Sequence, residues 1–147
     1  MTTLSNPENK QKVATNHLWW VTIAAIVIAL IGNAILYFIG NAVIDGGLTA
    51  VRPGETDPNK LPFFVMTIAT VVPAIIGAII FALLDRFNRP VSIFRIMAVI
   101  VTVLSFAPVI QLPDTVLIGS KIILGLMHIV AAVAITGILT TFGRARS

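Results

Sequence analysis

The sequence predicts an all-α integral membrane protein, a four-helix transmembrane bundle with antiparallel, up-down helices. Four apolar runs of roughly 20 residues each match the ~30 Å hydrocarbon core of a bilayer at about 1.5 Å per helical residue. Of the 147 residues, 57% are hydrophobic and only 11% are charged, whereas a soluble domain is usually about 25% charged. The polar segments between the runs are short. The predicted spans cover residues 18–40, 62–84, 94–112 and 119–142.

The four spans leave room for one domain, a transmembrane domain over residues 17–143. No soluble catalytic domain fits in the remaining loops. Residues 1–16 are polar and cannot bury a core, so they are predicted to form a flexible cytoplasmic tail, and 144–147 form a second cytoplasmic tail. The first apolar run is longer than a signal-peptide core and no convincing cleavage site follows it, so we interpret it as a retained span.

The distribution of basic residues predicts the orientation of the spans. With both termini inside, seven of the ten Lys and Arg residues are cytoplasmic and three are outside, while four of the six acidic residues are outside. This asymmetry satisfies the positive-inside rule. We therefore expect a multi-pass protein of the cytoplasmic membrane with its longest loop, over 41–61, on the outer face. The net charge of +4 is explained by this topology, and because no basic patch is interleaved with aromatic residues, no nucleic-acid partner is expected.

Two loops carry further expectations. The turn between the second and third spans is so short that these spans must be antiparallel neighbours. Asp85, Arg86 and Arg89 in that turn are interpreted as an inner-face anchor, through an interfacial ion pair or helix-end contacts, and not as an acid/base pair. In the outer loop, a short amphipathic segment over 42–51 is expected to lie on the membrane surface.

Two prolines within the spans are expected to kink their helices. Pro73 lies near the middle of the second span and Pro108 near the outer end of the third. Each removes one helical hydrogen bond. Static kinks are favoured over hinges that open a cavity, because membrane helices tolerate proline.

Small residues at helical spacing predict which faces pack together. Ala25, Ala29 and Asn33 recur every four residues on the first span, and Ala74 and Ala78 do so on the second. Small side chains allow helices in lipid to approach closely. We therefore expect these faces to point toward the bundle interior.

The sequence also predicts a polar pocket within the membrane. His128 lies about nine residues from the outer end of its span, or about 13 Å deep at the helical rise. Asn33 and either Thr67 or Thr70 fall at similar depth. A buried polar group in lipid needs a partner, so these side chains are expected to meet. His128 is interpreted first as a neutral, hydrogen-bonded packing residue; a ligand or substrate pocket, and then a proton relay or metal ligand, are the alternatives.

Catalysis is not expected. The chain has no cysteine, which excludes thiolate chemistry. A zinc site needs three or four ligands, but His128 has no carboxylate near it in the membrane, and His17 lies at the opposite interface. No nucleophile–base pair, Gly-rich phosphate loop or carboxylate pair can be assembled. We expect no catalytic residue, no metal and no cofactor.

Three motifs resemble a family of small four-span bacterial membrane proteins of unknown function. They are Leu83-Leu84-Asp85-Arg86-Phe87 with Arg89-Pro90, Leu104-Ser105-Phe106-Ala107-Pro108, and Leu126-Met127-His128-Ile129-Val130. The resemblance covers about 18–141. It implies a four-helix fold with the Asp85–Arg86 corner, Pro108 and His128 as shared architectural points. It implies no established activity.

The preferred functional hypothesis is a structural or accessory membrane module without catalysis. Its partners would be the lipid bilayer and either a second copy of the chain or another membrane protein. The alternative is a small transporter or ligand-binding protein that uses the pocket around His128 and Asn33. A cavity beside these residues would favour the alternative, and solid packing around His128 would count against it.

Overall fold

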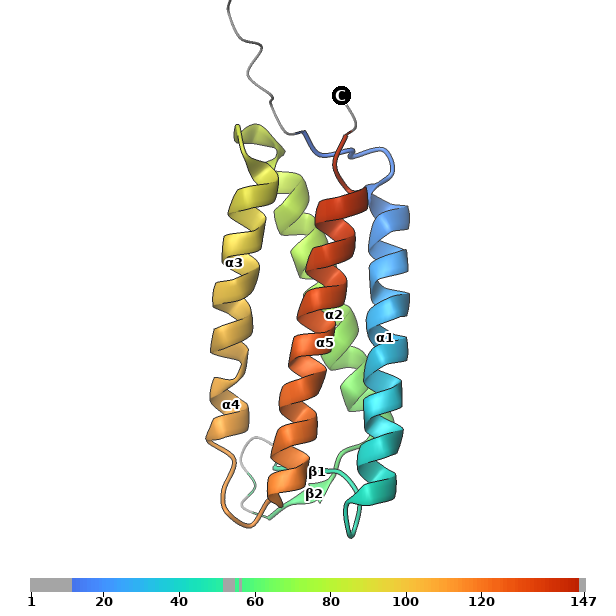
Figure 1. Ribbon diagram of the computed structural model, residues 1–147, viewed down its shortest axis with the longest axis vertical. Coiled ribbons are helices and arrows are strands. Elements are labelled where there is room, and N and C mark those ends of the chain that lie inside the picture. Colours follow the sequence, from blue (N-terminus) through green and yellow to red (C-terminus); the bar gives the residue numbers. More distant parts are fainter. Residues whose placement is uncertain (1–11, 52–54, 56, 146–147) are drawn as a thin grey trace, which may run out of the picture.

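The computed structural model describes residues 12–51, 55 and 57–145 and contains an antiparallel helical bundle (Figure 1). The elements are α1 (Leu18–Val43), β1 (Thr49–Ala50), β2 (Asn59–Lys60), α2 (Phe63–Leu83), the 3₁₀ turn η1 (Leu84–Arg86), α3 (Pro90–Ser105), α4 (Ala107–Ile110) and α5 (Ile118–Phe142). Four helical stretches are long and apolar enough to cross a membrane. They are Leu18–Val43, Phe63–Arg86, Pro90–Ile110 and Ile118–Phe142. The all-α transmembrane bundle predicted from the sequence is thereby confirmed.

The structure corrects two boundaries. The third span begins at Pro90, not at residue 94, because proline suits the first helical position, where no N–H is needed. The same span breaks at Phe106 between α3 and α4, beside Pro108, which lacks an N–H for the ladder. The amphipathic segment predicted over 42–51 does not form a single element. The chain leaves α1 at Val43 and turns through Gly46 and Gly47, which have positive φ values of 78° and 83°, into strand β1.

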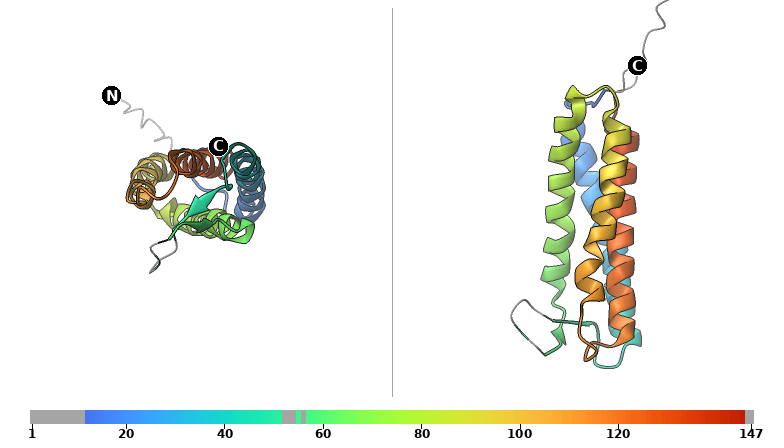
Figure 2. Two further views of the ribbon diagram at one scale, coloured as in Figure 1. Left: turned by 90° about the horizontal axis from the view of Figure 1, so that it is seen from below. Right: turned by 90° about the vertical axis from the view of Figure 1, so that its left-hand side faces the viewer.

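The helices surround a narrow interior, and α5 lies between α1 and α3 (Figures 1 and 2). Helix α5 packs against α1 along its length and against α3 on its other side. Helix α2 is inclined, so that it lies beside α1 near Phe63 and reaches α3 near Phe81. The second and third spans are thus joined by a tight turn, as predicted, but separate from one another beyond it.

Small residues line the buried faces, as the sequence predicts. Ala25 and Ala29 of α1 and Ala74 of α2 are fully buried, and Asn33 is 3% exposed. Large apolar side chains point outward instead; Trp19 and Trp20 are both more than half exposed and stack on one another. This inverted distribution is suited to a lipid surround, where close backbone approach replaces the hydrophobic effect as the source of helix association.

Both described chain ends lie at the same end of the bundle, which we call the terminal end. Val13 and Arg144 form an isolated antiparallel bridge, and the Val13 N–H donates to Asp85 Oδ1 at 2.7 Å. The tail predicted to be flexible over 1–16 is therefore held in place from Lys12 onward. Residues 1–11 lie outside the described part of the chain.

The opposite end, which we call the hairpin end, is covered by the β1–β2 segment (Figure 2). Leu48, just before β1, is completely buried against Met66 and Met127. The Asn41 side chain holds it there, because Asn41 Oδ1 accepts from the Leu48 N–H at 3.1 Å. The Thr49 N–H donates to Ser120 Oγ of α5 at 3.2 Å. The loop is thus tied to two spans and closes this end of the interior.

Candidate functional site: a polar chamber and a charged groove

A cavity of about 110 Å³ lies among α1, α2 and α5 in the half of the bundle nearer the hairpin end. It is lined by Asn33, Leu61, Val65, Met66, Ala69, Thr70, Leu124, Met127, His128 and Ala131. We call it the polar chamber. The structure therefore brings together Asn33, Thr70 and His128, three of the four residues predicted to form a pocket.

Asn33 carries the unusual feature of the chamber. Thr70 has one hydroxyl hydrogen, which it donates to the Met66 carbonyl at 2.9 Å. Its oxygen therefore accepts from Asn33 Nδ2, also at 2.9 Å, and this bond fixes the orientation of the Asn33 amide. Asn33 Oδ1 is then buried without a hydrogen-bond partner among the described residues. Because burial of an unsatisfied acceptor in an apolar surround is costly, the geometry calls for a donor in the chamber.

His128 also lines the chamber. Its Nδ1 lies 2.7 Å from the Leu124 carbonyl, which can only accept, so Nδ1 carries the hydrogen. In the neutral imidazole this leaves Nε2 as an acceptor. On its other side the ring lies near Phe106 of α3, with centroids 6.1 Å apart. The backbone bond and the aromatic contact together hold the ring beside the chamber.

Thr67 does not belong to the chamber. Its hydroxyl donates to the Phe63 carbonyl of its own helix at 3.1 Å, and it is absent from the lining. Thr67 and Thr70 are three residues apart on α2, so both were candidates from spacing alone. The rotation of α2 about its axis places Thr70, and not Thr67, beside Asn33 of α1.

The rest of the lining is apolar. Met66 and Met127 separate the chamber from the buried Leu48, and Val65 and Ala69 at its rim are exposed. No carboxylate and no lysine lines it, and the Thr70 hydroxyl that does is hydrogen-bonded to Met66 and Asn33. Across the described ranges, no three His, Cys, Asp or Glu side chains come close enough together to hold a metal ion. The chemistry available here is hydrogen-bond acceptance from a small molecule.

The remaining predicted residues lie elsewhere. Asp85 bonds to the Val13 N–H and Arg86 Nε donates to the Leu83 carbonyl at 3.0 Å, so the two side chains reach different backbone groups. Arg89 is exposed at the cap of α3. Pro73 lies inside α2, three residues beyond Thr70.

The chain matches the model of a family of unknown function, DUF6069, over residues 13–145. It belongs to this family. Comparison with curated proteins and with solved structures finds no match. The family resemblance stated from the three motifs is confirmed. DUF6069 is a family of unknown function, so membership brings no activity with it.

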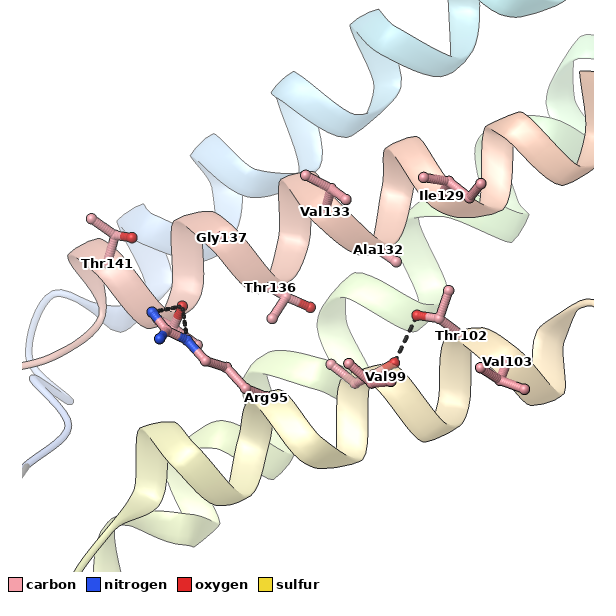
Figure 3. Close-up of a pocket in the computed structure, with 12 residues that line it drawn as sticks. Arg95, Val99, Thr102, Val103, Ile129, Ala132, Val133, Thr136, Gly137 and Thr141 are labelled. Carbon is pink, nitrogen blue, oxygen red and sulfur yellow. Dashed lines mark hydrogen bonds between the residues drawn. The ribbon is translucent and has the colours of Figure 1, made fainter.

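This DUF6069 protein has a second hollow that the sequence reasoning did not identify. It is a groove of about 450 Å³ between α3 and α5, and we call it the α3–α5 groove (Figure 3). Arg95 of α3 reaches across it, and its Nε and Nη2 both lie 3.3 Å from Thr140 Oγ1 of α5. A third span that begins at residue 94 would place Arg95 at its very start, among the cytoplasmic basic residues. Pro90 was the missed signal, since proline at the first helical position would have placed Arg95 one turn inside the span.

Proposed function

We propose that this protein is a non-catalytic membrane protein that binds a small hydrogen-bond donor in the polar chamber. The observation that carries the proposal is the Asn33 Oδ1 atom, which has no hydrogen-bond partner among the described residues. Asn33 is only 3% exposed, and it lines the same cavity as His128. An N–H or O–H group of the occupant would satisfy the Asn33 acceptor. The volume has room for several waters or for one small polar molecule.

The chamber is suited to binding in three respects. Its polar groups come from separate helices, so their convergence depends on the fold and is not a property of one helix. Asn33 and His128 are each held by a hydrogen bond, which reduces the entropy lost when a ligand binds. The exposed Val65 and Ala69 at the rim offer a route of entry from the side.

The second proposal is the structural or accessory role, which would be exercised toward a second copy of the chain or another membrane protein. A specific observation supports it. Asn33 and Thr70 bond directly across α1 and α2, and His128 bonds within its own helix. Under this proposal these polar side chains only fix the packing of the bundle, and the chamber holds water alone.

The two proposals differ in what copurifies with the protein. The protein would be extracted with its surrounding lipids, and its small-molecule content would be measured by native mass spectrometry and by mass spectrometry of a solvent extract. The variants would be Asn33→Leu and Thr70→Val, with Thr67→Val as the matched control, because Thr67 has the same chemistry on the same helix outside the chamber. Ligand binding predicts a stoichiometric small molecule that both chamber variants lose and Thr67→Val keeps. A bound molecule retained by all three variants, or none in the wild type, would contradict it.

We further propose that the terminal end faces the cytoplasm, in the cytoplasmic membrane. The described basic residues at that end are Lys12, Arg86, Arg89, Arg95 and Arg144, and one acidic residue, Asp85, accompanies them in the described part. The positive-inside rule favours that side for such a cluster. We expect a reporter that is active only in the cytoplasm to work when it is fused after Ser147. Activity of the exported type of reporter instead would reverse the orientation.

A further inference from the structure

We propose that the α3–α5 groove is a binding site for an anionic phospholipid, with the phosphate on Arg95 and one acyl chain along the groove. This inference is independent of the polar chamber. It rests on the charge, the shape and the position of the groove.

The charge of Arg95 is not neutralised within the described part of the chain. Its side-chain partner is the neutral Thr140 hydroxyl, and no acidic side chain of the described residues pairs with it. A guanidinium has five N–H donors in a planar fork, which is more than one hydroxyl can satisfy. A cation inside an apolar span is costly unless it is paired, so this arrangement calls for an anion from outside the protein. A phosphate accepts two parallel N–H bonds from such a fork.

The rest of the groove is built for a hydrocarbon chain. From Arg95 toward the middle of the bundle, its walls are mainly aliphatic, with four threonines among them: Thr102, Thr136, Thr140 and Thr141 (Figure 3). The aliphatic side chains come from both helices. They are Val99, Val103, Ile129 and Val133. Ala98, Ala132 and Gly137 keep the groove open, and a Cβ added at Gly137 would meet no atom within 4 Å. The result is a largely apolar groove with a cation at one end, which matches the shape and polarity of a phospholipid.

The position of Arg95 agrees with a headgroup contact. It lies five residues after Pro90, on the order of 8 Å along the axis from the start of α3. A long Arg side chain at that depth extends toward the phosphate level of the leaflet. The exposed Arg86 and Arg89 lie at the same end and add to the positive field there. An apolar helix from a partner protein would fill the groove but would leave the guanidinium without an anion, so the lipid is favoured.

The test is native mass spectrometry of the full-length protein from mixed bilayers of phosphatidylglycerol and phosphatidylcholine with identical acyl chains. The wild type is expected to retain phosphatidylglycerol in about fivefold preference, which corresponds to the ~1 kcal/mol of one basic residue near anionic lipid. Arg95→Gln is expected to lose this preference. Arg89→Gln, a matched loss of charge outside the groove, is expected to keep it.

A second variant tests the acyl-chain part of the site and remains informative if Arg95→Gln fails to fold. Gly137→Leu fills the groove from a position where the added atoms meet open space, and it is expected to reduce retention of both lipids. Equal retention of the two lipids by the wild type, or unchanged retention in Gly137→Leu, would overturn the proposal. Thermal stabilisation of delipidated protein by inorganic phosphate equal to that by phosphatidylglycerol would show a free-phosphate site instead. A dimer in the wild type that Gly137→Leu dissociates would show that a second copy fills the groove.

Discussion

The two sides of α5 solve the problem of polar groups in lipid differently. Toward α1, α5 is closely packed, and the polar chamber among α1, α2 and α5 encloses Asn33 and Thr70, which hydrogen-bond to one another and leave Asn33 Oδ1 without a partner among the described residues. Toward α3, α5 leaves an open groove in which Arg95 has one neutral acceptor. The third span is also the least buried: 11% of its most apolar stretch is buried in the protein, against 22–28% for the other three spans. An enclosed polar group must find its hydrogen-bond partner within the protein or in a trapped molecule. A polar group in an open groove can instead interact with a lipid headgroup.

The largest expected effect tests the close packing between α1 and α5. A Cβ at Gly32 would lie 2.6 Å from Val130 Cγ1, so Gly32→Leu forces the two helices apart. We expect a loss of about 2–3 kcal/mol in the free energy of unfolding, as for overpacked cores. The measurement is reversible unfolding in mixed micelles. Gly137→Leu is the control, since it adds the same side chain where space is open. Similar losses in both variants would show that the two sides of α5 do not differ in packing.

A smaller effect is expected at the hydrogen bond between α1 and α2. Asn33→Leu removes the bond to Thr70 at nearly constant volume. Interhelical hydrogen bonds in membranes contribute about 0.6 kcal/mol on average and up to about 1.7, so we expect a destabilisation of about 1 kcal/mol in the same unfolding assay. Thr67→Val should change it by much less, because its hydroxyl bonds only within α2. An unchanged stability of Asn33→Leu would mean that this bond does not hold the enclosed side together.

The next effect concerns the terminal end, where the chain termini meet α2. Asp85→Ala removes the acceptor of the Val13 N–H. Because Asp85 is exposed, we expect the free energy of unfolding to fall by only about 0.5 kcal/mol, the low end of what one hydrogen bond contributes. The more specific readout is faster amide hydrogen exchange at Val13. If exchange at Val13 were unaffected, the contact between the tail and α2 would not protect that amide.

The smallest expected effect tests whether Arg95 depends mainly on the Thr140 hydroxyl or on lipid phosphate. Thr140→Val removes the hydroxyl that Arg95 contacts and leaves the groove in place. If lipid phosphate is the main partner, the preference for phosphatidylglycerol should stay within about twofold of the wild type, since one neutral hydrogen bond contributes little. Native mass spectrometry against Arg95→Gln measures this. A loss as large as that of Arg95→Gln would assign the main role to Thr140.

Part of the candidate site could be predicted from the sequence because depth in a membrane follows from counting residues. Asn33, Thr70 and His128 were placed at one level by the helical rise alone, and the structure brings them to one cavity. Depth does not determine rotation, however, so Thr67 remained as plausible as Thr70. The orphaned Asn33 oxygen could not be foreseen either, because it depends on where the single hydroxyl hydrogen of Thr70 goes.

The sequence by itself determined the class, the number of spans and the burial of the small-residue faces of α1 and α2. Span length and hydropathy depend only on local composition and bilayer thickness, and an even number of spans returns both termini to one side. The tertiary structure alone decided that α2 separates from α3, that Leu48 and the β1–β2 segment close one end, and that Arg95 faces Thr140 across an open groove. These features depend on the inclination and rotation of helices. Those are set by the sum of many side-chain contacts between distant segments and leave no local signature in the chain.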